Sequence, residues 1–131
     1  MGLDTTHGAW RGAYSSFSAW RNAIAQAAGF TLKEYRSPYS NSVLKYPNID
    51  SFDLPPTAAM GDWPEPPFDP LLVLFAHSSC DGVIHPEHCK LLADRLEGLL
   101  HRLDDDNKAL TVRFIDGLRL ASSREELLEF E

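Results

Sequence analysis

The fold of this chain is decided by residues 86–122, PEHCKLLADRLEGLLHRLDDDNKALTVRFIDGLRLAS. A proline at the first helical position and apolar residues at three- and four-residue steps predict an amphipathic helix from Pro86 to Leu103. Its apolar stripe is Cys89, Leu92, Ala93, Leu96, Leu99, Leu100 and Leu103. The run DDDN at 104–107 would end this helix and cap a second one from Lys108 to Ser122. The face of that second helix is Leu110, Phe114, Leu118 and Ala121.

Toward the N-terminus, the sequence predicts a further helix from Gly8 to Ala28, with Thr5 or Thr6 as its N-cap and Gly29 as its stop signal. Its alanine-rich second half favours helix. The spacing of side chains defines two faces. An apolar face for the core contains Ala9, Ala13, Trp20, Ala23, Ile24 and Ala27. A second face mixes aromatic rings with polar tips and contains His7, Trp10, Tyr14, Phe17 and Arg21.

Residues 31–70 are rich in proline, since eight of the nine prolines lie between Pro38 and Pro70. Proline fixes φ and has no amide hydrogen, so neither a long helix nor a central strand is expected here. Apolar anchors recur throughout the segment, which argues against a disordered linker. We therefore expect an ordered loop that wraps around the domain, with at most one short helical turn.

The apolar run at residues 71–76, LLVLFA, is short and lies between Pro70 and the sequence HSSCDG, which predicts a buried strand. Residues 127–130 are compatible with a strand beside it, and residues 124–128 with one more helical turn. At 131 residues, one hydrophobic core is the default. The predicted architecture is a single domain over 1–131 of the α+β class, mostly helical, with a small minor sheet and a long ordered loop.

Charge and composition exclude several classes of protein. The formal net charge of −7 argues against a nucleic-acid polymer or an anionic membrane as partner. The longest apolar run has six residues, far fewer than a membrane span needs. No basic region followed by an apolar stretch opens the chain, so we expect no secretory signal and a cytoplasmic location.

The charge is distributed unevenly along the chain. Residues 1–46 carry a net charge of +3 and eight of the fourteen aromatic residues, whereas residues 47–131 carry −10. Asymmetry of this kind predicts that the basic first third contacts either an anionic partner or the acidic remainder of its own chain.

Three of the five histidines and both cysteines lie in HSSCDGVIHPEHC, residues 77–89. One hypothesis is a zinc site, with His77 and Cys80 as one ligand pair and either His85 and His88 or His88 and Cys89 as another. A second is a nucleophilic Cys80 assisted by His77 and Asp81.

The alternative interpretation of this cluster is structural. Cys89 lies on the apolar stripe of its helix, where a free cysteine is commonly a small core residue. Ser78, Ser79 and Asp81 suit the hydrogen bonds of a tight turn. We therefore predict a structural turn with no metal, no cofactor and no disulfide, and an enzyme at HSSCDG stays open as an alternative.

The second face of the N-terminal helix offers the components of a nucleotide pocket. Aromatic rings stack on bases, guanidinium groups bind phosphate oxygens, and the free amides of a helix N-terminus attract anions. The predicted ligand contacts are His7, Trp10, Tyr14, Arg21, Arg36 and Tyr39, with His77 and Asp81 lining or bracing the site. The alternative is that these rings are core residues and the arginines pair with nearby acids.

Four segments resemble a family of small, uncharacterised phage and prophage proteins: MGLDTTH at 1–7, W-x-G-x-Y at 10–14, HSSCDG at 77–82 and FIDGLR at 114–119. The family pattern has H-S-D-C-D-G, so Ser79 stands where an acid is usual and no acidic ligand is required there. His85 and His88 lie outside the pattern, which weakens the zinc hypothesis. The resemblance implies a phage-related setting and no particular reaction.

Taken together, these features predict a non-enzymatic accessory protein that binds a small anionic, nucleotide-derived ligand, such as a host immune signal, and sequesters it as an anti-defence protein. Residues 36–68 would close over the ligand, and a homo-oligomer would let the loop of one chain cover the pocket of another. Two alternatives stay open. One is the enzyme at HSSCDG, and the other is an inhibitor whose acidic C-terminal two thirds, including Asp104 to Asp106, occupies a basic surface of a host protein.

Overall fold

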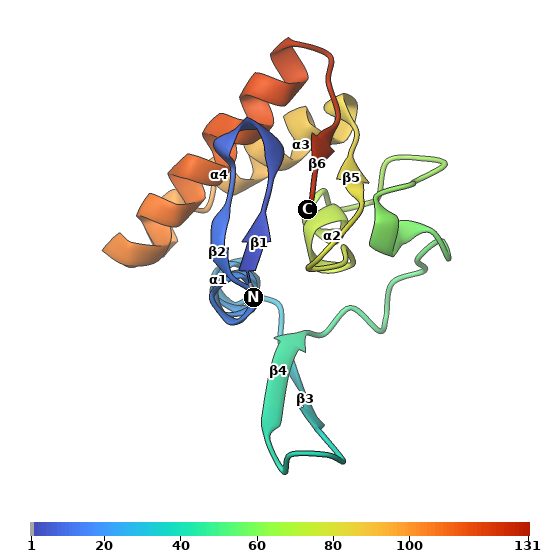
Figure 1. The fold of residues 1–131 in the computed structure, drawn as a ribbon, viewed down its shortest axis with the longest axis vertical. Helices are drawn as coiled ribbons and strands as arrows, with labels where there is room; N and C mark the ends of the chain where they lie inside the picture. The colour runs from blue at the N-terminus through green and yellow to red at the C-terminus, as the bar shows by residue number, and fades with distance from the viewer. Residues whose placement is uncertain (1) are drawn as a thin grey trace.

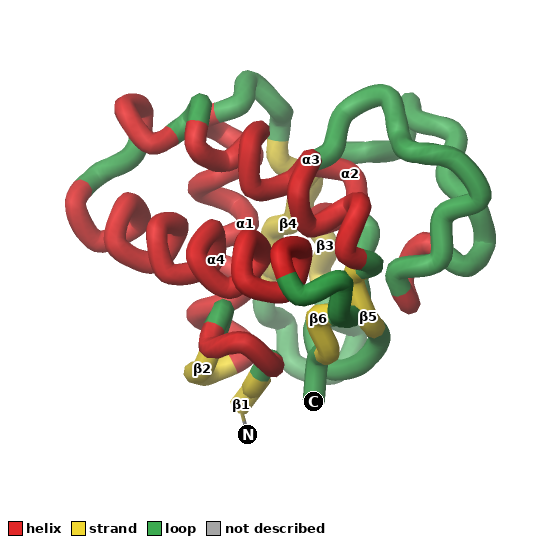
Figure 2. The backbone as a smooth tube through the Cα atoms, turned by 90° about the horizontal axis from the view of Figure 1, so that it is seen from above, coloured by secondary structure: helices red, strands yellow, loops and turns green. Residues whose placement is uncertain are grey.

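The core is built around three helices, α1 (Tyr14–Ala27), α3 (Pro86–Glu97) and α4 (Asp105–Ser123), with α4 in contact with both α3 and α1 (Figures 1 and 2). The computed structural model describes residues 2–131. A short helix, α2 (Leu71–Phe75), packs against α3, and three separate two-stranded antiparallel sheets surround the helices. The chain is therefore mostly helical and of the α+β class, as the sequence predicts.

The C-terminal helices follow the apolar stripes of the sequence, with different boundaries. Helix α3 ends at Glu97, six residues before the predicted end, and a 3₁₀ turn, η3 (Leu100–Arg102), follows. Helix α4 begins at Asp105 because Asp104 acts as its N-cap, with Oδ1 accepting a hydrogen bond of 2.8 Å from the Asn107 amide. The apolar stripes of α3 and α4 are buried because the two helices pack against each other.

The predicted N-terminal helix from Gly8 to Ala28 is wrong at its start, since α1 begins only at Tyr14. Strand β1 (Gly2–Asp4) pairs with β2 (Arg11–Ala13), and a 3₁₀ turn, η1 (Thr6–Gly8), joins them. His7 and Gly8 both adopt left-handed backbone angles, with φ of 62° and 69°, which no helix can include. The hydroxyl of Thr5 accepts a 2.9 Å hydrogen bond from the Trp10 amide and closes this turn.

The proline-rich segment contains regular structure that its composition did not reveal. Strands β3 (Leu32–Arg36) and β4 (Val43–Pro47) form a hairpin that extends away from the helices (Figure 1). Proline is tolerated because Pro38 lies in the connecting turn and Pro47 ends a strand. Between β4 and residue 70 the backbone is irregular, apart from the 3₁₀ turn η2 (Ala58–Met60).

The strand predicted at 71–76 is wrong, because Leu71–Phe75 forms helix α2. All five of its residues are buried, and a short apolar run that is buried on every side carries no periodicity with which to distinguish strand from helix. The side chain of Asp69 accepts a hydrogen bond from the Leu71 amide and starts the helix. The C-terminal strand β6 (Leu128–Glu129) pairs instead with β5 (Val83–Ile84).

An aromatic cluster fills the centre of the domain. The rings of Phe17, Trp20 and Phe114 are mutually in contact and are fully buried. The indole nitrogen of Trp20 donates a 2.9 Å hydrogen bond to the hydroxyl of Thr111, so this buried donor is satisfied. Along residues 2–131, no helix has the length and the apolar composition needed to cross a membrane.

Candidate functional site

The predicted aromatic ligand contacts belong to the core. Trp10 is only 3% exposed, and its ring centroid lies 5.1 Å from that of Phe17 and 5.3 Å from that of Trp20. Tyr14 is half-buried and packs against the same cluster. Of the two interpretations of this stripe, the geometry matches the one in which the rings are core residues.

Arg21 also has a structural position. Its Nη1 donates hydrogen bonds to the carbonyl oxygens of Leu74 (3.3 Å) and His77 (2.8 Å), and its guanidinium lies 4.7 Å from the Phe17 ring centroid. Burial lowers the pKa of Arg21 to about 10. Through Nη1, the guanidinium that we expected to bind a phosphate therefore binds the carbonyl of Leu74 in α2 and that of His77 just beyond the end of this helix.

His77 fastens the HSSCDG turn. Its Nδ1 lies 2.7 Å from the carbonyl oxygen of Ser78 and its Nε2 lies 2.9 Å from that of Val83, while its ring packs on Phe130. Gly82 has a left-handed backbone, with φ of 99°, and a Cβ there would lie 3.0 Å from His77 Cε1. Burial lowers the pKa of His77, although the hydrogen bonds to these two carbonyls oppose the shift, and the neutral ring, with one N–H, can donate to only one of them.

The geometry at HSSCDG does not assemble a catalytic set. Both ring nitrogens of His77 face backbone carbonyls, so neither is directed at the Cys80 thiol. The Cys80 Sγ lies 3.4 Å from the Ser78 hydroxyl and 3.9 Å from Asp81 Oδ1, and all three groups are at an exposed turn. Burial raises the pKa of Cys89 to about 12, which makes its thiol inert at neutral pH. Within residues 2–131 no group of three His, Cys, Asp or Glu side chains is placed to hold a metal ion.

The remaining predicted contacts are far apart in the fold. His7 binds the Thr6 hydroxyl and Glu126, with Nε2 3.1 Å from Oε1 of that carboxylate. Arg36 and Tyr39 lie on the β3–β4 hairpin and are exposed, Tyr39 to 97%. None of the five best-formed cavities of the described chain is lined by any of the eight predicted contact residues.

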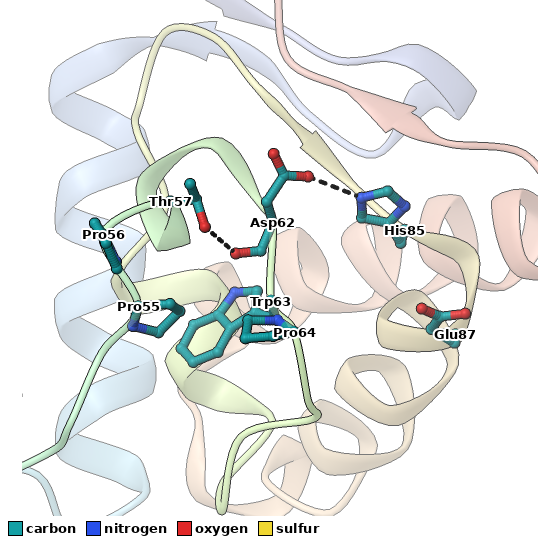
Figure 3. Close-up of a pocket in the computed structure, with 8 residues that line it drawn as sticks. All are labelled: Pro55, Pro56, Thr57, Asp62, Trp63, Pro64, His85 and Glu87. Carbon is teal, nitrogen blue, oxygen red and sulfur yellow. Dashed lines mark hydrogen bonds and ion pairs between the residues drawn. The ribbon is translucent and has the colours of Figure 1, made fainter.

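One of these cavities has a volume of about 460 Å³ and lies between the proline-rich segment and the start of α3 (Figure 3). We call it the Trp63 cradle. It is lined by Pro55, Pro56, Thr57, Asp62, Trp63, Pro64, His85 and Glu87. Figure 3 shows Pro55 on one side of the Trp63 indole and the His85 and Glu87 side chains on the other. A volume of several hundred cubic ångströms is in the range of small-ligand sites.

A second hollow of about 350 Å³ adjoins the Trp63 cradle. It is lined by Asp53, Pro55, Trp63, Pro64, Glu65, Pro66, Pro67 and Phe68, so the two hollows share Pro55, Trp63 and Pro64. Trp63 thus forms a wall of both, and the ring of Phe68 is 96% exposed at the edge.

The electrostatic character of the two hollows is acidic. Their linings contain four carboxylates, those of Asp53, Asp62, Glu65 and Glu87, and no lysine or arginine. Of the lining residues, His85 alone can carry a positive charge, and its Nε2 lies 3.2 Å from Asp62 Oδ1. An aromatic wall among carboxylates favours a positively charged group over an anion.

Local hydrogen bonds hold the cradle in shape. The Thr57 hydroxyl donates a 2.8 Å hydrogen bond to the carbonyl oxygen of Asp62, and the Asp62 amide donates back to the carbonyl of Thr57. The Ser78 amide donates a 2.7 Å hydrogen bond to the carbonyl of Ala59, which attaches the segment to the HSSCDG turn. Gly61, with φ of 89°, leaves no room for a Cβ against the Val83 carbonyl.

The cradle residues come from two separate segments, residues 55–64 and 85–87, so no single stretch of sequence predicts this site. The signal in the sequence was a tryptophan set among prolines and carboxylates, Asp62-Trp63-Pro64-Glu65. In comparisons with known proteins, no family model, no curated protein and no solved structure matches this chain, and the resemblance to phage proteins stays a prediction.

Proposed function

We propose that this chain is a binding protein whose Trp63 cradle receives a positively charged side chain of a protein partner. The observation that supports this function is the composition of the two hollows, which share the Trp63 indole as a wall and contain four carboxylates and no lysine or arginine, with Asp62 paired to His85. A cation within about 6 Å of a tryptophan ring gains roughly 0.5–2 kcal/mol, more as water is excluded. Among the functions considered from the sequence, this proposal most resembles the inhibitor whose acidic surface occupies a basic surface of a host protein.

Arginine is the side chain that this lining suits best. Its planar guanidinium stacks on aromatic rings and binds carboxylates through two parallel hydrogen bonds, whereas the lysine ammonium is a strongly hydrated point charge. Two adjoining hollows that share the Trp63 wall also provide room for two neighbouring side chains of one polypeptide segment. Prolines in the walls reduce the conformational entropy that binding would otherwise cost.

The small anionic ligand predicted from the sequence is a second candidate, and the β3–β4 hairpin is the observation that favours it. Arg36 and Tyr39 are both exposed there and offer a guanidinium and a ring to a nucleotide. The anti-defence role implied by the phage resemblance applies to either ligand. In one case a host protein would be occupied, and in the other an immune signal would be sequestered.

Peptide binding followed by NMR at the three indole N–H groups tests the proposal. A capped Arg-Tyr-Arg peptide is expected to shift the Trp63 resonance and leave those of the buried Trp10 and Trp20 in place, and a capped Glu-Tyr-Glu peptide should shift none. ATP serves as the anionic probe for the second candidate and should shift the backbone amide resonances of Arg36 and Tyr39, because the hairpin contains no tryptophan.

Charge variants connect that signal to the cradle. Glu65→Gln combined with Glu87→Gln is expected to weaken binding of the arginine peptide by about 2- to 5-fold for each carboxylate removed. The matched control is Asp116→Asn, an exposed carboxylate on α4 outside both hollows, which should leave affinity unchanged. Equal affinity in the cradle variant and the control would contradict the proposed function.

A further inference from the structure

The β3–β4 hairpin exposes several large apolar side chains. Tyr35 and Leu44 face one another across the strands and are each about half exposed, and Tyr46 lies opposite Lys33 on the same face. Val43, on the other face, is exposed to a similar degree. The hairpin contacts α1, and Asn22 donates a 2.9 Å hydrogen bond to the Lys45 carbonyl, but the apolar side chains at its far end have no cover within the described chain.

The hairpin is also the basic part of an otherwise acidic molecule. Lys33, Arg36 and Lys45 lie on its strands against the single acid Glu34. Lys33 pairs with Asp50 at 2.7 Å, and Lys45 lies 3.9 Å from Glu34. Arg36 is exposed and makes no ion pair with any residue of the described chain. With Tyr39 in the turn beyond it, the end of the hairpin presents a free guanidinium and a free ring.

The hairpin of a chain does not reach the cradle of the same chain. In Figure 1 the hairpin extends away from the helices, and its turn forms the end of the molecule remote from them. The cradle, by contrast, lies against the start of α3 and the HSSCDG turn. A contact between these two complementary surfaces therefore requires two molecules.

We propose that the partner in the Trp63 cradle is the β3–β4 hairpin of a second copy of this chain, with Arg36 entering among the carboxylates and Tyr39 beside the Trp63 wall. This inference rests on the proposed function, because it names the polypeptide that supplies the positive charge. When each hairpin enters the cradle of the other copy, the two contacts are equivalent and a closed, two-fold dimer results. The site is then complete only in the dimer.

Sedimentation equilibrium over a range of concentrations measures this association. We expect the unmodified chain to dimerise and the dissociation constant to increase with salt, because the contact is electrostatic. Arg36→Glu is expected to raise the dissociation constant by about tenfold or more, since it places a carboxylate among carboxylates. The paired change Glu65→Arg with Glu87→Arg should have the same effect. Circular dichroism checks that both variants are folded.

Mixing the two variants provides the decisive measurement. In the mixed dimer, the hairpin that carries Arg36→Glu meets the cradle with the two new arginines, and the unmodified hairpin of the other variant meets an unmodified acidic cradle. At a concentration where each variant alone is mostly monomeric, the mixture should therefore dimerise. The control is Arg36→Glu mixed with a chain that carries both Arg36→Glu and Asp116→Arg. Its new arginine lies outside the cradle, so this mixture should stay mostly monomeric.

Dimerisation tests the exchange of hairpins, and peptide binding tests the cradle itself. A monomer at every concentration, or a dimer that is unaffected by Arg36→Glu, would overturn the exchange of hairpins. The Arg36→Glu variant leaves its own cradle unoccupied, so binding of the Arg-Tyr-Arg peptide to this variant tests the cradle alone. Peptide binding without dimerisation would overturn the inference and support the proposed function.

Discussion

Arg21 Nη1 lies 2.8 Å from the carbonyl oxygen of His77, and this hydrogen bond connects the middle of α1 to the end of α2. His77 lies just beyond the C-terminal end of α2, and the charged donor binds its backbone carbonyl. The same His77 side chain fastens the HSSCDG turn, so the contact links α1 to the segment that supports the Trp63 cradle. Arg21 therefore contributes to the fold through Nη1.

Replacing Arg21 is expected to destabilise the protein. Arg21→Met keeps the aliphatic stem and leaves two part-buried carbonyls without their charged donor, which should lower the free energy of unfolding by about 2–3 kcal/mol. Urea denaturation followed by circular dichroism measures the change. The matched control is Arg102→Met, whose exposed guanidinium donates to the Ala27 carbonyl; because water can replace that donor, we expect a loss below about 1 kcal/mol. Equal losses in the two variants would contradict this role.

Gly117→Ala should destabilise α4, although alanine normally favours helix by up to about 1 kcal/mol over glycine. The new Cβ would lie 2.5 Å from Ala9 Cβ and 2.7 Å from Ala9 Cα, so the helix and the N-terminal turn must separate. We expect a loss of about 1–3 kcal/mol in the free energy of unfolding. At Gly98 the nearest atom to an added Cβ is a carbonyl oxygen at 3.5 Å, and Gly98→Ala should be neutral or stabilising. A stable Gly117→Ala variant would show that the two segments are not in close contact.

Stability should fall as the pH is lowered below the ordinary histidine range. Burial lowers the pKa of both His77 and His88 from the usual 6.5, so below that pH the unfolded chain binds protons that the folded chain does not. The stabilising contribution is complete above about pH 6.5 and is lost as the pH falls toward the pKa values of the folded state. Urea midpoints at about pH 7.5 and about pH 5.5 measure the effect.

Two substitutions identify which histidine causes the loss of stability at low pH. His88→Leu removes one of the buried groups and should reduce the difference between the two midpoints, whereas His101→Leu should not, because the His101 side chain is exposed in the folded chain. A pH difference that is identical in His88→Leu and the unmodified protein would exclude His88 as a contributor.

The two cysteines should react very differently with iodoacetamide. Cys80 is exposed and Cys89 is fully buried with a pKa raised to about 12, so mass spectrometry should detect one adduct on the folded protein near neutral pH and two in urea. Cys80→Ser should leave the folded protein unmodified. Labelling of Cys89 under native conditions would indicate that α3 opens locally.

The helical part of the fold was predictable because its signals are local. Cys89, Leu92 and Leu96 recur at the helical period, and Asp104 caps the helix that follows it, so residues 86–123 form helices with boundaries that differ by a few residues. The run Leu71–Phe75 was predicted as a strand because all five of its residues are apolar. They are all buried, so no polar position reveals the helical period. The N-terminal helix was predicted too long, since the left-handed backbone at His7 has no strong sequence signal.

The mostly helical α+β class and the contrast between a basic, aromatic first third and an acidic remainder follow from the sequence, because periodicity and charge are properties of neighbouring residues. The role of each individual side chain, by contrast, depends on how the helices pack. Trp10 and Arg21 share a sequence pattern typical of a ligand site, yet packing buries the first among aromatic rings and commits the second to carbonyls more than fifty residues away. The Trp63 cradle likewise joins Asp62 and His85 across 23 residues of chain. Contacts of this kind depend on how the helices pack, and no local pattern records them.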